Sequence, residues 1–258
     1  MDDASPASHD IELSGRLKNT GTIIEKLMRD KTALGKMQDI AGLRVVLGQG
    51  GRAEQNQIAD ELSRREWLCE AERIDRRSDP RFGYRAVHVV GHVDGYFLEI
   101  QIRTMLQHRW AVVFERLADE WGRGMRYGDP PPDEALKIAG ASVSAREVDR
   151  YMKELADYID DLERKQLAAE AQEAADAAAA DELSVRELES RRSQVVQTRR
   201  QNDLDANALV ASLRDVLIAA TASKGRAELT ESLRLRSTSW SPDRPSPRRE
   251  RGDPRVLA

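Results

Sequence analysis

Three polar side chains recur with a spacing of two in the segment "EIQIRT" (99–104), namely Glu99, Gln101 and Arg103. Side chains in a β-strand alternate between its two faces, so these groups should share one face and the isoleucines the other. A carboxylate, an amide and a guanidinium on one face could together bind a polar or phosphorylated ligand. A solvated sheet face would show the same alternation, so other segments must separate the two interpretations.

The preceding segment, "GYRAVHVV" (83–90), adds polar groups to this face. Tyr84 and His88 are an even number of residues apart, so they should share a face of a strand. An Asp-Gly pair follows at 94–95, a typical two-residue hairpin turn, and it predicts that the two strands pair over residues 84–103. Taken alone, His88 would be an ordinary half-buried histidine and Tyr84 an aromatic residue covering a hydrophobic edge.

Cationic residues surround a predicted helix start in "GRLKNTGTIIEKLM" (15–28). Arg16, Lys18 and Lys26 place positive charge where it opposes the helix dipole. Such an arrangement is unfavourable unless an anion binds among the cations. The segment is therefore a candidate for binding phosphate groups.

A carboxylate and a further arginine flank the first predicted strand, in "DIAGLRVV" (39–46). Asp39 comes directly before the strand, and Arg44 lies among its apolar residues. Individually, a loop aspartate is usually a cap or turn residue, and a strand arginine usually reaches solvent. Only their coincidence with the other polar segments favours a functional interpretation.

The elements that would carry these residues alternate between helices and strands before residue 105, and essentially no strand signal follows. From Thr104 to about Gly122 the apolar spacing is that of one helix face, on which His108 and Glu115 are interpreted as surface residues. This pattern predicts an α+β fold built on a mixed sheet. The expected order is a helix, a strand at 42–48, a helix at 53–66, a strand at 67–77, the hairpin and the closing helix.

The second half of the chain has a different character, because no glycine or proline occurs from 141 to 224. It should be helical, with a break near 201–207. An apolar seam in it should pack on the first half or on another subunit. The seam residues are Val148, Met152, Leu155, Ile159 and Leu162. The expected regions are an N-terminal tail at 1–14, a folded domain at 15–128, a helical region at 133–224 and a disordered tail at 225–258.

Composition bounds the class of protein. The 258 residues carry a formal net charge of −4, which argues against a protein whose whole surface binds nucleic acid or anionic membrane. No long apolar run and no basic-then-apolar leader is present, which predicts a cytoplasmic protein. Cys69 cannot form an internal disulfide and is expected to be a buried, inert thiol.

Taken in order, the four polar segments resemble the synthetase domain of the RelA/SpoT family of (p)ppGpp synthetases, of the small type without a hydrolase domain. The resemblance covers residues 15–128 and rests on "GRLKNTGTIIEK", "DIAGLRVV", "GYRAVH" and "EIQIRT". It implies a mixed-sheet, nucleotidyltransferase-like domain. Every matched motif precedes residue 128, so the helical half is expected to be dispensable for chemistry.

The resemblance implies transfer of pyrophosphate from ATP to the 3′ hydroxyl of GDP or GTP, which makes the (p)ppGpp alarmone, with Mg²⁺ as cofactor. Asp39 and Glu99 match the family's catalytic and Mg²⁺-binding carboxylates, and Glu99 could also accept the proton of the hydroxyl. The positions matching ATP-binding residues are Arg16, Lys18, Lys26 and Arg44. Those matching acceptor-nucleotide-binding residues are Tyr84, His88, Gln101 and Arg103.

Two alternatives stay open at this stage. A toxin-type relative would use the same motifs to pyrophosphorylate the 3′ end of tRNA, and a catalytically weak relative would be a nucleotide-sensing helical interaction protein. The long helical half favours the latter, whereas intact Asp39 and Glu99 count against it. The seam also makes a homo-oligomer through the C-terminal helices possible, and no membrane partner is expected.

Overall fold

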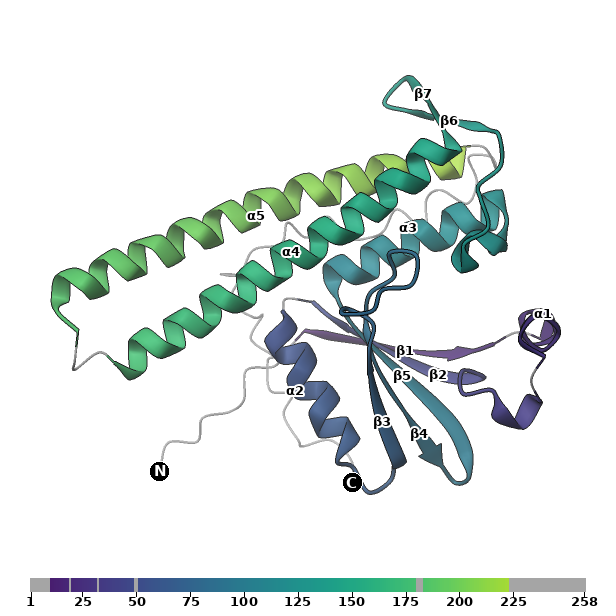
Figure 1. The fold of residues 1–258 in the computed structure, drawn as a ribbon, viewed down its shortest axis with the longest axis horizontal. Coiled ribbons are helices and arrows are strands. Elements are labelled where there is room, and N and C mark those ends of the chain that lie inside the picture. Colours follow the sequence, from purple (N-terminus) through teal and green to yellow (C-terminus); the bar gives the residue numbers. More distant parts are fainter. Residues whose placement is uncertain (1–9, 19, 32, 49–50, 180–182, 223–258) are drawn as a thin grey trace, which may run out of the picture.

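A five-stranded mixed sheet forms the centre of the first half of the chain (Figure 1). The computed structural model describes residues 10–18, 20–31, 33–48, 51–179 and 183–222. The spatial order is β1-β2-β5-β4-β3; β2 and β5 are parallel neighbours, and the other pairs are antiparallel. The strands are β1 (Ile11–Leu17), β2 (Ala41–Leu47), β3 (Cys69–Asp75), β4 (Val87–Val93) and β5 (Tyr96–Thr104).

The predicted hairpin is confirmed as β4 and β5, with Val90 opposite Glu99 and His88 opposite Gln101, but β4 begins at Val87, so Tyr84 precedes the strand in which it was expected. Both turn residues, Asp94 and Gly95, have positive φ angles, as a tight primed turn requires. The α+β fold class is confirmed with it. One apolar face of the sheet packs under helix α2 (Arg52–Ser63) in a core made of Val45, Leu47, Ala59, Val87, Val89, Ile100 and Ile102.

The opposite, polar face is bordered by helix α3 (Met105–Trp121), which follows β5 directly. Thr104 caps α3 through the Gln107 amide in a capping box, so the strand and the helix join without a loop. The shorter elements of this half are α1 (Thr20–Asp30) and the 3₁₀ turns η1 (Leu34–Lys36) and η2 (Arg123–Tyr127).

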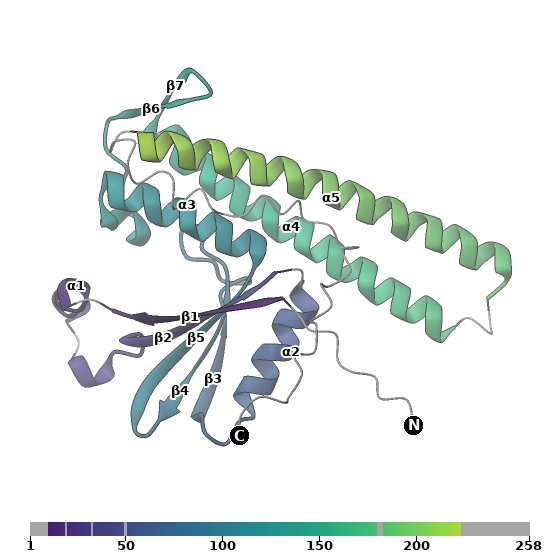
Figure 2. The ribbon, with the colours of Figure 1, turned by 180° about the vertical axis from the view of Figure 1, so that it is seen from behind.

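The two long helices α4 (Ala145–Ala178) and α5 (Val185–Ala222) form an antiparallel hairpin that lies along α3 (Figure 2). All five seam residues of α4 are buried, and the α5 side of the shared core consists of Leu209, Leu213, Val216, Leu217, Ala219 and Ala220. The seam therefore packs within the chain, against α3 and α5. Within the described parts of the chain, no helix is both long and apolar enough to cross a membrane.

Polar contacts fasten α4 to the first half of the chain. Arg85 is buried, and it donates to the Ala156 carbonyl at 3.2 Å and to the Asp157 carboxylate at 2.6 Å. The indole of Trp110 on α3 donates to the Met152 carbonyl at 2.6 Å. Gly83 has a φ of +89°, and a Cβ there would lie 2.8 Å from the Trp110 ring. The loop before β4 is thus held between α3 and α4.

Several sequence expectations are wrong. Strand β1 precedes α1 and was not expected; its alternation is short and its residues Leu13 and Ile11 are exposed. A hairpin of β6 (Ala135–Ile138) and β7 (Ala141–Ser144) lies beyond residue 105, within the region expected to be helical.

Helix α5 runs through 201–207 without a break. The break between the long helices falls instead after Ala178. Cys69 is exposed, since it begins the edge strand β3. The N-terminal tail predicted at 1–14 is wrong for residues 11–14, which belong to strand β1, and residues 1–9 lie outside the described residues, as does the predicted tail at 225–258.

Candidate active site

Two carboxylates from neighbouring parallel strands line one cleft on the polar sheet face. Glu99 on β5 lies opposite Gly42 on β2, and Asp39 comes three residues before Gly42. Parallel pairing of the two strands therefore brings residues 60 positions apart in sequence together. The cleft is lined by Lys18, Asp39, Gly42, Leu43, Arg44, Glu99 and Gln101.

Asp39 is held by two of the predicted cations. Lys18, directly after β1, donates to Oδ2 at 2.5 Å, and Lys26 on α1 donates to Oδ1 at 2.8 Å. Burial alone would raise the pKa of Asp39, but the hydrogen bonds and charges of the two lysines outweigh it and lower the pKa. Asp39 is thus ionised at neutral pH and ties β1, α1 and β2 into one cationic rim.

Glu99 is more deeply placed, with a side chain 16% exposed. His88 Nδ1 contacts Oε1 at 2.9 Å, and Gln101 Nε2 donates to Oε2 at 2.8 Å. Burial raises the pKa of Glu99, the His88 and Gln101 contacts lower it, and the nearby Asp39 charge raises it; the net effect is a lowered pKa. Asp39 and Glu99 line the same cleft, so a cation bound there would be attracted by both carboxylates.

The predicted polar face closes into a ring of hydrogen bonds. Arg103 donates to the Tyr84 hydroxyl at 3.0 Å and to the Gln101 carbonyl oxygen at 2.9 Å. The Tyr84 hydroxyl lies 2.9 Å from His88 Nε2. When Tyr84 donates to Nε2 and Nδ1–H donates to Glu99, both ring nitrogens of His88 are paired, whereas Nε and Nη1 of Arg103 are buried without an acceptor. Two hydrogen-bonded paths therefore lead from Arg103 to the Glu99 carboxylate. One passes through Tyr84 and His88, and the other through Gln101.

Tyr84 takes part through its hydroxyl while its ring is half-buried against the helical core. The Arg103 guanidinium lies 4.9 Å from the ring centroid, and His88 packs edge-on at 5.7 Å. Burial raises the pKa of the Tyr84 hydroxyl, partly opposed by the Arg103 charge and hydrogen bond, so the group stays a neutral donor.

The two remaining predicted positions differ in what the structure describes. Arg44 lines the cleft and lies opposite Gln101 in the β2–β5 register. Arg16 lies in β1 opposite Gly42, which places its backbone beside the strand that follows Asp39. The Arg16 side chain falls outside the described part of the chain. Of the ten predicted site residues, the other nine gather around the cleft and the ring behind it.

One residue near the site was missed by the sequence interpretation. His108 on α3 is half-buried, and burial together with the charges of Arg103, Arg44 and Arg109 lowers its pKa to about 4. It is therefore neutral at pH 7 and belongs to the cationic border of the polar face. The sequence shows only that His108 lies one helical turn after Thr104. That position alone does not tell whether the side chain points toward the sheet or toward solvent.

The donor set suits a hard divalent cation of the kind that the family resemblance implies. Two ionised carboxylates face one cleft, and the described residues contain no cluster of three or more metal-ligating side chains. Mg²⁺ commonly takes one or two carboxylates and completes its shell with water and substrate phosphates. Asp39 and Glu99 fit that pattern, whereas a dedicated all-protein cage would need more ligands.

Comparison with known proteins identifies the same segment. Residues 15–117 match the model of a family described as a region found in RelA/SpoT proteins. An uncharacterized protein of Mycobacterium tuberculosis is 36% identical over 142 residues, which cover 53% of this chain and 50% of the relative. A counterpart of Mycobacterium bovis matches equally. The chain spans about half the length of the curated relatives it matches, and the matched segment 15–117 contains the four motifs on which the sequence resemblance rests.

Solved structures give weaker likenesses. The small alarmone synthetase 1 from Bacillus subtilis bound to its product pppGpp is 22% identical, with a TM-score of 0.48, over 62% of this chain and 79% of that chain. A GTP pyrophosphokinase family protein from Streptococcus pneumoniae is 25% identical, with a TM-score of 0.47, over 63% and 77%. Because both TM-scores are below 0.5, the likeness to this family rests on the sequence match over residues 15–117.

Proposed function

We propose that this chain transfers the pyrophosphate group of ATP to the 3′ hydroxyl of GDP or GTP. The observation that carries the proposal is the pair of ionised carboxylates, Asp39 and Glu99, facing one cleft inside a cationic rim. The RelA/SpoT match over residues 15–117 supports the reaction class. Phosphoryl-type transfer needs positioning and charge neutralisation more than covalent chemistry, and the cleft offers both.

The donor nucleotide would bind through the cationic rim. Lys18 and Lys26 now neutralise Asp39, so a triphosphate would compete for the same ammonium groups. Release of the lysines to phosphate would leave the Asp39 carboxylate free to bind a cation instead. Arg44 would contribute a guanidinium on the same face.

Mg²⁺ would be held by Asp39 and Glu99, where it would neutralise negative charge on the phosphate oxygens of the donor nucleotide. The lowered pKa of Glu99 makes this carboxylate a poor proton acceptor and a good cation ligand. His88 keeps Glu99 oriented by donating through Nδ1. We therefore assign Glu99 chiefly to the metal and only secondarily to the hydroxyl proton.

The acceptor nucleotide would use the ring side of the face. Tyr84, His88, Gln101 and Arg103 form one hydrogen-bonded unit next to Glu99, so a base or sugar contacting Tyr84 would have its hydroxyl near the carboxylates. Stacking on a base would require the Tyr84 ring to shift from its present packing against the helical core. We propose such a shift on acceptor binding.

The test is a transfer assay with γ-labelled ATP and Mg²⁺, offered GDP, GTP and deacylated tRNA separately. Label in the guanosine nucleotide would support the proposal, whereas label only in tRNA would change the acceptor. No transfer to any acceptor, with ATP binding retained, would favour a nucleotide-sensing protein. An Asp39→Asn variant serves as the control for contaminating kinases, because any transfer it retains at the wild-type rate does not come from this cleft.

A further inference from the structure

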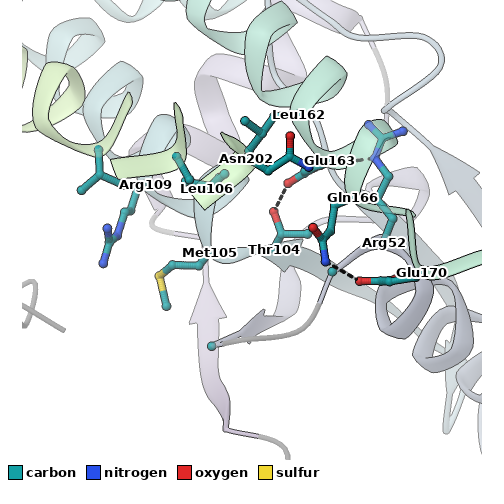
Figure 3. A pocket seen from close by; sticks show the side chains of 14 residues that line it. Arg52, Thr104, Met105, Leu106, Arg109, Leu162, Glu163, Gln166, Glu170 and Asn202 are labelled. Atoms are coloured by element: carbon teal, nitrogen blue, oxygen red, sulfur yellow. Dashed lines mark hydrogen bonds and ion pairs between the residues drawn. The ribbon is translucent and has the colours of Figure 1, made fainter. Parts of the chain in front are cut away.

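A junction of buried polar side chains lies where the end of β5 meets α2 and α4 (Figure 3). Its centre is Glu163 on α4, which is buried. The carboxylate accepts from the Thr104 hydroxyl, from Gln107 Nε2 at 2.7 Å and from Arg52 Nε at 3.3 Å. Helix α4 begins after residue 117, so the family match over residues 15–117 does not account for this carboxylate.

The junction also holds β5 on the other side of Arg103. Gln55 on α2 is completely buried, and its Nε2 donates to the Ile102 carbonyl and to Gln107 Oε1, both at 2.8 Å. Ile102 is thus tied to α2, and Thr104 is tied to α4. The two neighbours of Arg103 in the strand are therefore each fixed by a helix.

Arg103 depends on this support because its own contacts orient it weakly. A single nitrogen, Nη2, makes both of its hydrogen bonds, and the two acceptors are neutral: the Tyr84 hydroxyl at 3.0 Å and the Gln101 side-chain oxygen at 2.9 Å. Nε and Nη1 are buried without an acceptor among the described residues. A carboxylate bound by two guanidinium nitrogens would fix the group more firmly. The place of the guanidinium therefore follows the place of the strand.

We propose that Glu163 is a positioning residue for the polar sheet face, a role that rests on the function proposed above. Through the Thr104 hydroxyl it fixes the end of β5 and with it Arg103. Hydrogen-bonded paths lead from Arg103 to the Glu99 carboxylate, so a shift at the end of the strand reaches the proposed cation ligand. Misplacing a reacting group by about 1 Å can cost about a hundredfold in rate. Helix α4 is then needed for chemistry, although every matched motif precedes it.

Asp160 offers a matched control on the same helix. It lies three residues before Glu163 and pairs with the same arginine, Arg52. It has no hydrogen bond to Thr104 or Gln107 in the described part of the chain. Asp160→Asn therefore weakens the attachment of α4 to α2 but leaves the contact with the end of β5 in place.

The experiment measures transfer by Glu163→Gln and Asp160→Asn at a temperature below the melting transition of both. We expect kcat to fall by about tenfold or more in Glu163→Gln. The KM for ATP should stay unchanged, because Lys18 and Lys26 bind Asp39 and not the junction. Asp160→Asn should keep the wild-type kcat even if it melts earlier. Equal losses of kcat in the two variants, or none in Glu163→Gln, would overturn the proposal.

Thr104 variants test the path from the helix to the strand. Thr104→Val should lower kcat as much as Glu163→Gln does, and the double variant should lose no more than either, because both changes break one contact. Thr104→Ser keeps the hydroxyl and should keep the wild-type kcat. Additive losses would show that the two residues act separately and would refute the path. If Glu163→Gln does not fold, equal kcat in Thr104→Val and Thr104→Ser refutes it instead.

A readout that needs no activity separates this proposal from the proposed reaction. His88 Nδ1 lies 2.9 Å from Glu99 Oε1, so its proton should exchange slowly with water and give a nuclear magnetic resonance signal, which His88→Gln assigns by its loss. Glu163→Gln, or Thr104→Val in its place, should speed this exchange, and Asp160→Asn should not. Faster exchange in a chain that transfers nothing would reject the reaction and keep the coupling. Unchanged exchange would reject the coupling even in an active enzyme.

Discussion

The polar sheet face and the α4–α5 hairpin hold their charged groups in opposite ways. On the sheet face, Asp39 and Glu99 receive two donors each, and the pKa of both carboxyl groups is lowered. At the hairpin, Glu163 also receives donors, yet complete burial raises its pKa above the usual value. The face keeps its carboxylates ionised beside an open cleft, whereas the hairpin uses its carboxylate to join two layers.

The largest expected effect tests whether the hairpin is a separate region at all. Ending the chain at Ala179 removes α5, whose Leu209, Leu213 and Val216 cover the core shared with α3 and α4. Exposed core surface costs about 25 cal/mol per Å², so we expect loss of the cooperative thermal transition and aggregation. Circular dichroism melts measure this.

The matched control ends the chain at Ala222, directly after α5, and should melt like the full chain. Retention of a cooperative transition by the shorter chain would show that the helices are an appendage, as their position after the last motif had suggested. Tight packing between α3 and α5 instead makes the hairpin part of the fold that positions β5.

The next largest effect is expected on the proposed reaction, which should need the sheet face. Glu99→Gln keeps the size of the side chain but removes the charge that would hold Mg²⁺, so pyrophosphate transfer should fall by about a hundredfold or more. The melting temperature should change little, because the apolar core is untouched. Glu72→Gln, at an exposed position on β3, is the control for loss of a sheet carboxylate. Wild-type transfer by Glu99→Gln would remove the face from the mechanism.

The sheet face could be predicted from sequence because its information is local. Strand alternation placed Glu99, Gln101 and Arg103 together, and the motifs added Asp39, which then lies beside β5 in the parallel register. The direction of each hydrogen bond could not be predicted, since it depends on side-chain positions across three strands.

The hairpin was predictable only as helix. Its seam fixed which side of α4 is buried, but a seam does not name its partner, so packing on α3 and α5 was only one of two options. The β6–β7 hairpin was missed because its strands are four residues each, too short to show alternation.

The pH dependence of the unfolding free energy should show a smaller effect that distinguishes the carboxylates of the two regions. The raised pKa of Glu163 means that its contribution to stability is present below its unfolded value, about 4.5, and is lost as the pH rises through the folded value. Asp39 and Glu99, with lowered values, contribute in the opposite sense and lose stability as the pH falls. Glu163→Gln should therefore flatten the decline of unfolding free energy above pH 4.5.

Urea denaturation across pH measures that slope, which for one proton cannot exceed about 1.4 kcal/mol per pH unit. Glu154→Gln, at an exposed position on the same helix, should keep the wild-type slope. An unchanged slope in Glu163→Gln would mean that the Arg52 pair offsets burial completely, and the contrast between the two regions would disappear.

The smallest expected effect concerns the ring that joins the regions at Tyr84. Tyr84→Phe removes the hydroxyl that accepts from Arg103 and donates to His88, and leaves the aromatic ring in place. Two hydrogen bonds at about 1 kcal/mol each set the scale of the stability loss. The proposed stacking on the acceptor base does not need the hydroxyl, so kcat should fall more than the acceptor KM rises, because His88 no longer holds Glu99 firmly. Tyr96→Phe, 78% exposed on β5, is the control and should match the wild type in both. A rise in acceptor KM at constant kcat would instead assign the hydroxyl to direct contact with the nucleotide, and the ring would then be a binding surface rather than a support for Glu99.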